Sequence, residues 1–241
     1  TPQGGKDVFV AKVLPPPLLP DGAVVNSASF APSPAPLAPG TIASVFGSFL
    51  NDGSTVLSTG FGNDGRLITS LGGTTVRVNN IPAPMFFSTP QQLGIQIPFE
   101  VAGQATASVT VSVGGITSAT RTINIAPTSP GVFTVNQSGG GAGIITHADG
   151  SLVSAENPAR PNEVVVLFAT GLGVVNPGLG TGTPSSGNQT AAATTVFVDG
   201  TSNPATVDFS GASPGFVGLY QVNFRVPANT RAGSSIPVSL T

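Results

Sequence analysis

Side chains that could perform acid–base, nucleophilic or metal chemistry are scarce in this chain. His147 is the only histidine, cysteine is absent, and ten acidic residues are spread along the sequence. One histidine cannot build a metal site that uses several histidines, and the polar stretch Thr146–Gly150 around it predicts an exposed loop side chain. The sequence therefore predicts a protein that is not an enzyme and that binds no metal and no cofactor.

Two aspartates and two glycine-rich stretches are the remaining candidates for ligand binding. Asp52 and Asp64 each lie in an Asn-Asp-Gly turn, but the alternating acidic residues of a calcium loop are missing. Gly139–Gly141 and Gly171–Gly173 have the glycine content of a phosphate loop. No predicted helix and no Lys-Ser or Lys-Thr pair follows them. All four are interpreted as turns.

Four amide side chains occur in recognisable patterns. Asn136 and Asn188 each begin an N-glycosylation triplet, which makes them candidate acceptors and glycans candidate partners, although so short a pattern is common by chance. Gln92 and Gln221 occupy equivalent places in an internal repeat. A buried amide that fastens a loop to a strand end explains both glutamines, and a ligand contact is the alternative.

Composition narrows the class of protein. Charged residues are 7% of the 241 residues, against about 25% in typical soluble domains, whereas hydrophobic residues at 39% suffice for cores. A net charge of −2 gives no electrostatic basis for nucleic-acid binding, and no apolar run approaches the roughly 20 residues of a membrane helix. Neutral polar surfaces suit exported proteins, so we expect an extracellular or cell-surface location. Neither an initiator methionine nor a signal peptide begins the sequence, which predicts a piece of a longer precursor.

Short alternating segments bounded by turn residues indicate an all-β fold. Thr74–Val78, Ser108–Val113, Thr194–Val198 and Gln221–Val226 alternate as half-buried strands do. The predicted architecture is two tandem Ig-like β-sandwiches after an N-terminal strand and a Pro-rich spacer. The predicted boundaries are 1–22 for the strand and linker, 23–135 for the first module and 136–241 for the second module.

The two modules repeat each other, and the second lacks one strand. Gln92–Pro98 matches Gln221–Pro227, and each segment leads to a further alternating strand. In the first module a Gly114-Gly115 turn then leads to a closing strand around Ala119–Ile125, for which the second module has no equivalent. A sandwich without its last strand has an open edge and an uncovered core. The predicted lining of the resulting acceptor groove is Val222, Phe224, Val226, Ile236, Val238 and Leu240.

A strand-like segment outside both modules could fill such a groove. Val8–Leu14 alternates, so that one face is apolar and the other is interrupted by Lys12. The apolar face is the better candidate for burial, with Phe9 as its anchor. The predicted donor strand comprises Val8, Phe9, Val10, Ala11 and Val13. Two other interpretations stay open: a remnant of a truncated domain, and a strand that docks on its own chain.

Several short motifs together resemble the Solibacter-type C-terminal domain family, a tandem Ig-like tail of large secreted bacterial proteins. The resemblance covers residues 23–241 and implies a β-sandwich fold without catalytic residues. Members of that family continue with another glycine turn and strand, so this chain departs from the pattern where the repeat does. Separately, Gly4–Lys12 resembles the end of a short bacterial β-propeller repeat. The motifs that carry the family resemblance are Asn26–Phe30, Ala38–Gly40, Ala83–Phe87, Asn157–Ala159, Ala169–Gly173 and Gly218–Asn223.

These observations predict a structural role. The N-terminal strand would enter the second module of a neighbouring subunit, as in pilus-like filaments built by donor-strand complementation. Because donor and acceptor are different surfaces, the contact does not close on itself and gives a head-to-tail homopolymer outside the cell. The alternative function is an adhesive or carbohydrate-binding C-terminal module of a larger secreted protein. The absence of Trp and the single Tyr speak against an aromatic sugar platform.

Overall fold

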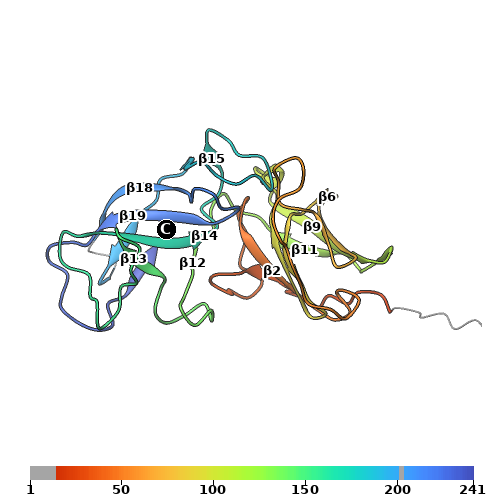
Figure 1. Cartoon of the computed structure of the whole chain (residues 1–241), viewed down its shortest axis with the longest axis horizontal. Helices are drawn as coiled ribbons and strands as arrows, with labels where there is room; N and C mark the ends of the chain where they lie inside the picture. Colours follow the sequence, from red (N-terminus) through yellow and green to blue (C-terminus); the bar gives the residue numbers. More distant parts are fainter. Residues whose placement is uncertain (1–14, 201–203) are drawn as a thin grey trace, which may run out of the picture.

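The structure is a computed structural model that describes residues 15–200 and 204–241. The predicted donor strand lies outside the described residues. Figure 1 shows the chain folded into two lobes along its long axis, with the first described residues at one end of the molecule. Each lobe contains its own cluster of buried hydrophobic residues.

The first lobe consists of two antiparallel sheets around one core. A five-stranded sheet has the order β1-β2-β8-β7-β3, and a six-stranded sheet has the order β10-β9-β5-β4 with β11 on β9 and β6 on β5. A single turn of 3-10 helix, η1, follows β8. The elements are β1 (Val24–Asn26), β2 (Ile42–Phe46), β3 (Val56–Leu57), β4 (Ser70–Leu71), β5 (Thr74–Val78), β6 (Ile81–Pro82), β7 (Met85–Ser88), β8 (Gln92–Gln96), η1 (Phe99–Val101), β9 (Thr106–Val113), β10 (Ile116–Thr117) and β11 (Arg121–Asn124).

The second lobe has one large sheet and one small sheet. The large sheet has seven strands in the order β12-β14-β19-β18-β16-β15, with β13 also paired to β14, and the small sheet contains only β17 and β20. The strands are β12 (Gly131–Val132), β13 (Ile145–His147), β14 (Val164–Thr170), β15 (Val175–Asn176), β16 (Gln189–Thr190), β17 (Val196–Val198), β18 (Thr206–Ala212), β19 (Tyr220–Arg225) and β20 (Val238–Leu240).

The all-β prediction is confirmed. Every strand pair in the named sheets is antiparallel, and within residues 15–200 and 204–241 the only helical element is η1. None of the described helical structure has the length and apolar character required to cross a membrane. The division into two Ig-like modules stays a prediction, and β12 already pairs with β14 before the predicted boundary at residue 135.

The strands form where the sequence alternates. Along β9 every second residue is buried, and Val109 and Val111 are 0% exposed. Gly114 and Gly115 both have positive φ, at 55° and 85°, which is the backbone of the tight turn that joins two antiparallel strands. The chain then returns along β10 and β11, both of which pair with β9.

Hydrogen bonds between polar groups join the two lobes. The Thr170 hydroxyl accepts a bond of 2.8 Å from the Ile42 N–H and donates one of 2.7 Å to the Gly218 carbonyl. The Gly182 N–H donates to the side-chain oxygen of the buried Gln96 at 2.7 Å. Because these bonds link the ends of β2, β8 and β14, they couple the five-stranded sheet of the first lobe to the seven-stranded sheet of the second.

Candidate functional site

The candidate site is the outer edge of β20. β20 pairs with β17 in the register Val196↔Leu240, Phe197↔Ser239 and Val198↔Val238. Flanking bonds join Thr195 with Thr241 and the Asp199 N–H with the Pro237 carbonyl. Ser239 and the odd-numbered residues on either side of β20 therefore face β17 through their backbone. Alternation in an antiparallel ladder then directs the N–H and C=O groups of Val238 and Leu240 away from β17. No other described strand pairs with this edge.

The same edge is covered in the first lobe. β9 pairs with β5 as β20 pairs with β17, so that Val109 and Val111 correspond to Val238 and Leu240. Val109 pairs with Arg121 of β11, whereas Val111 accepts a bond of 2.8 Å from the Ser118 N–H. The first lobe therefore shows what the edge of β20 lacks within the described residues: an antiparallel strand that gives these backbone groups their partners.

A groove of about 640 Å³ lies beside this edge. Its apolar floor includes Ile145 and Leu167 of the large sheet, and β20 forms one wall. Val238 and Leu240 are only partly buried there, although their counterparts in β9 are fully buried. The residues that line the groove are Ser29, Pro130–Val132, Thr134, Gly139–Gly143, Ile145, Leu167 and Ser234–Leu240.

The structure separates the six predicted groove residues into two sets. Ile236, Val238 and Leu240 line the groove, but the three predicted residues Val222, Phe224 and Val226 do not. Val222 and Phe224 belong to β19, which lies between β14 and β18 and has no free edge. All six residues pack in one cluster, because the core faces of the two sheets meet. The sequence interpretation missed Ile145, Leu167 and the 139–143 loop, whose only signal was its glycine content.

The two candidate glycan acceptors differ in accessibility. Asn136 is exposed in the loop between β12 and β13, where its side-chain oxygen accepts bonds from Ser138. Asn188 is 8% exposed, and its amide donates to the Pro177 carbonyl at 2.8 Å while its oxygen accepts from Ser185. The folded chain therefore presents Asn136 for modification but uses Asn188 to hold a turn.

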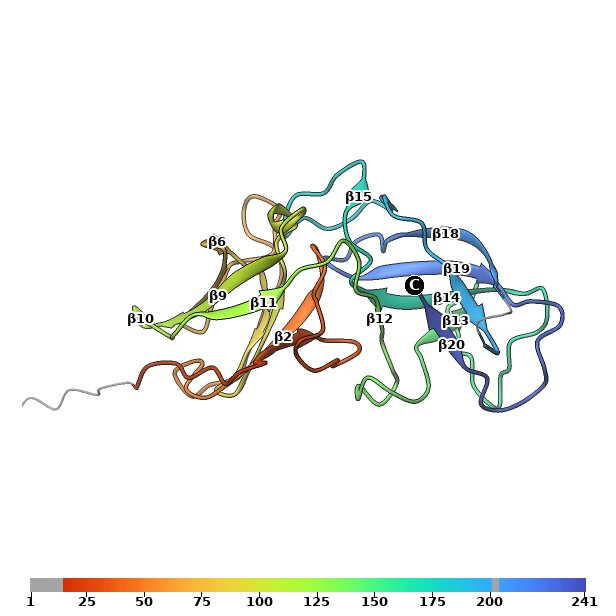
Figure 2. The same ribbon diagram turned by 180° about the vertical axis from the view of Figure 1, so that it is seen from behind.

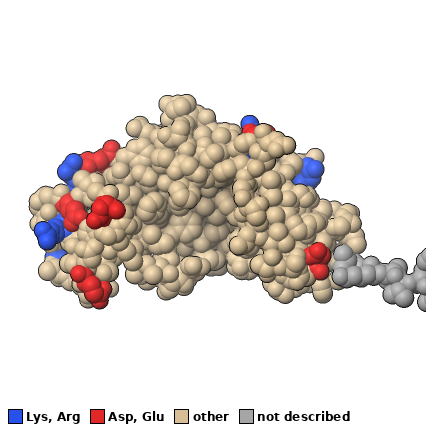
Figure 3. Space-filling model, in the orientation of Figure 1, with Lys and Arg blue, Asp and Glu red and all other residues tan. Residues whose placement is uncertain are grey.

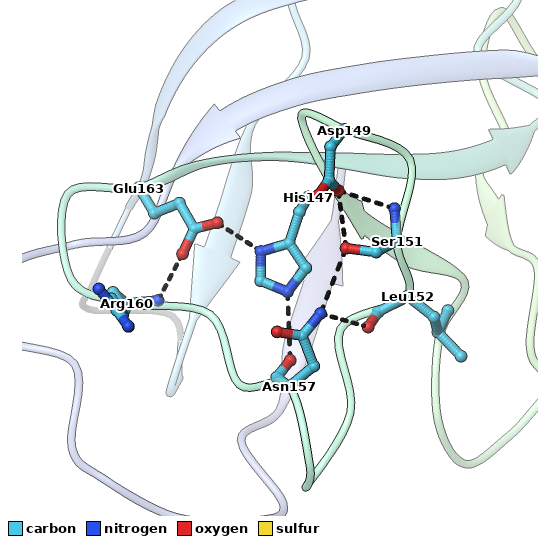
Figure 4. A network of polar contacts seen from close by, with 7 residues as sticks. All are labelled: His147, Asp149, Ser151, Leu152, Asn157, Arg160 and Glu163. Carbon is cyan, nitrogen blue, oxygen red and sulfur yellow. Dashed lines mark hydrogen bonds and ion pairs between the residues drawn. The ribbon is translucent and has the colours of Figure 1, made fainter.

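The prediction of an exposed loop histidine is wrong. His147 ends β13, and its side chain is 13% exposed. Its Nδ1 contacts a Glu163 carboxylate oxygen, and its Nε2 lies 3.1 Å from the Asn157 carbonyl (Figure 4). Both ring nitrogens thus face acceptors, and only the protonated ring can donate from both. The hydrogen bond to Glu163, followed by that to Asn157, raises the pKa of His147.

This pair predicts a pH dependence of stability. Because the pKa of His147 is raised above 6.5, the contribution of the charged ring is fully present below pH 6.5 and is lost as the pH rises through the folded value. The bonds from His147 and from the Arg160 N–H lower the pKa of Glu163 below 4.5. Its contribution is therefore present above pH 4.5 and is lost as the pH falls through the folded value. The contributions of charged His147 and charged Glu163 to stability are both fully present between pH 4.5 and pH 6.5.

Urea unfolding at a series of pH values measures the effect. We expect the free energy of unfolding to decline as the pH rises through the folded pKa of His147, and His147→Gln to flatten that decline. A matched Glu163→Gln variant should weaken the same dependence, because it replaces the carboxylate that holds the proton on the ring by a neutral amide. An unchanged decline in both variants would contradict the assignment.

Charge is unevenly distributed over one face of the molecule. On the face shown in Figure 3, the acidic and basic residues lie mostly at the end formed by the second lobe, and the middle is uncharged. Two ion pairs of that lobe are Arg231–Asp199 at 2.6 Å and Arg225–Asp208 at 3.0 Å. Among the described residues no group of three or more His, Cys, Asp or Glu side chains could hold a metal ion.

Tyr220 offers no ring surface on which a sugar could stack. Tyr220 is the only tyrosine, and it is fully buried, with its hydroxyl donating to the Gly173 carbonyl. Burial raises the pKa of Tyr220 well above its ordinary value. The Tyr220 ring therefore packs in the core of the second lobe.

Comparison with protein-family models gave no match to this chain, and comparison with curated proteins gave none either. The geometry of the groove therefore carries the functional argument.

Proposed function

We propose that the protein is a structural subunit of an extracellular filament, assembled by insertion of the N-terminal strand of one subunit into the second lobe of the next. The observation that carries the proposal is the edge of β20, unpaired among the described residues, beside a groove whose lining includes Ile145, Leu167 and Val238. Such an edge is a template for strand addition. As part of the same proposal, the protein is secreted and is a member of the Solibacter-type family.

The alternation of residues 8–13 matches what the groove requires. A strand added to β20 must offer backbone groups to Val238 and Leu240 and apolar side chains to the groove floor. Phe9, Ala11 and Val13 share one face of such a strand. The same segment carries Lys12 on its other face, which can remain in water.

The position of the spacer favours a neighbour's groove over the chain's own. Leu18 is fixed to the first lobe by two backbone bonds with Ser48, of 3.0 Å and 2.9 Å. Leu18 lies five positions after Val13, and an extended chain of five steps spans at most about 18 Å. The first described residues lie at the end of the molecule away from the second lobe (Figure 1). A donor strand anchored there is well placed for another subunit.

Phe9→Asp should hinder assembly far more than Val8→Ser. Burial of a large apolar side chain contributes about 1.5–3 kcal/mol, so loss of the Phe9 contact alone weakens the junction by about one to two orders of magnitude. A carboxylate in the groove adds a desolvation cost. Sedimentation and electron micrographs of the two purified variants measure the difference. Val8→Ser is the matched control, because it changes the neighbouring residue on the other face. Equal assembly of both variants would contradict the donor assignment.

A further inference from the structure

The first lobe contains a filled version of the site that is open in the second. β11 runs antiparallel to β9, with Arg121↔Val109 and Ile123↔Ala107 as partners. Ile123 and Ile125 are buried in the first core, so this strand both completes the ladder and covers the sandwich. The chain thus carries its own template for the occupant of the β20 edge.

From this template we infer that the donor strand of a second subunit pairs antiparallel to β20 and takes the place that β11 takes on β9. The inference rests on the proposed function and adds the direction of the strand. Positions opposite Val238 and Ile236 would correspond to Arg121 and Ile123. From Leu240 toward Ile236, the core-facing side chains of the donor then enter the groove in the order Phe9, Ala11, Val13.

The groove walls agree with this placement. In the first lobe the Arg121 guanidinium donates to the carbonyls of Leu19 and Pro20, which puts β11 beside the segment that leads to β1. β13 pairs with β14 as β1 pairs with β2, and the loop between β12 and β13 lines the groove opposite β20. The open space in the second lobe therefore lies where β11 lies in the first.

The direction decides where the incoming subunit sits. The loop between β19 and β20 forms the end of the molecule opposite the first described residues, and β20 runs from it back toward the C-terminus (Figures 1 and 2). An antiparallel donor leaves the groove at that outer end. At most about 18 Å of chain joins the donor strand to the first lobe of the incoming subunit. That first lobe then lies beyond the outer end of the acceptor subunit, which is called the tip below. Subunits would follow one another along their long axes.

The same reach brings exposed apolar side chains of the incoming subunit close to that tip. Leu18 is 60% exposed and Phe49 is 52% exposed. Leu18 forms a bridge with Ser48, the residue before Phe49. A parallel donor would leave the groove at the other end of β20 and would place these side chains beside the middle of the acceptor instead.

Disulfide cross-linking tests the direction of the donor strand whatever its register on β20. The chain has no cysteine, so single cysteines can be introduced in pairs. One replaces Ser235 or Ser239, which are both exposed and lie four residues apart on either side of Val238; the other scans residues 7–13. Positions opposite these serines are non-hydrogen-bonded pairs, whose Cα atoms approach closely enough for a disulfide.

We expect the donor position that reacts with Ser235→Cys to lie four residues after the one that reacts with Ser239→Cys. Non-reducing gels of oxidised filaments give the ladder directly. A position four residues before would show parallel pairing and overturn the inference, while the proposed function would stand. Filaments without any cross-link would show that another segment occupies the edge and would also overturn it. A chain that stays monomeric and forms no cross-link would refute the proposed function itself.

Discussion

Extension of the chain after Thr241 by a Gly-Gly turn and a second copy of Lys6–Leu14 is expected to give a self-complemented monomer. β20 ends next to Thr241, and a tight glycine turn returns the chain antiparallel, as Gly114-Gly115 does after β9. The appended strand can then occupy the edge of β20 before a neighbour does, because the attachment gives it a high effective concentration. Polymer formation should be lost.

The extended monomer should also be more stable to unfolding than the unextended monomer. Burial of the appended copies of Phe9 and Val13 contributes about 3–6 kcal/mol in total, and each new backbone bond adds about 0.5–1.5 kcal/mol. Guanidinium unfolding against the unextended monomer measures the gain. The matched control carries Asp in the appended copy at the position of Phe9, and it should polymerise like the original chain. An extended protein that still forms filaments would refute the assignment of the β20 edge.

Removal of Thr1–Leu14 is expected to give a monomer at concentrations where the full chain is polymeric. The remaining protein keeps the β20 edge and the groove but has no strand to offer, so it can only accept. Added to the full chain, it should shorten filaments, because it occupies an end that offers a donor. Normal filaments from the deleted chain would contradict the function proposed for residues 8–13.

The deleted and the extended variants together give the sharpest measurement. One offers only an acceptor, and the other offers only its original N-terminal strand as a donor. Their mixture should form a one-to-one dimer and no larger species, which light scattering after gel filtration can establish. A deleted chain with Val238→Asp is the matched control, because a charge at the groove edge should abolish the dimer while β17 and the large sheet remain in place.

The class of fold and the position of the open edge could be predicted from the amino-acid sequence. Alternation with period two marks strands, and a buried face must recur at every second residue, so β5, β9 and β19 could be recognised without coordinates. The repeat gave information beyond the positions of the strands, because the matching segments Gln92–Pro98 and Gln221–Pro227 aligned the two modules. That alignment alone predicted that no segment up to Thr241 corresponds to β11.

The lateral order of the strands could be known only from the folded chain. Periodicity identifies the buried face of a strand but not its lateral neighbours, which are set by contacts between distant segments. For this reason Val222 and Phe224 are in the core of a central strand, whereas Ile236, Val238 and Leu240 line the groove. His147 meets Glu163, and Asn188 is buried, through the same long-range packing. The direction inferred for the donor likewise comes from the pairing of β11 with β9, which no local pattern contains.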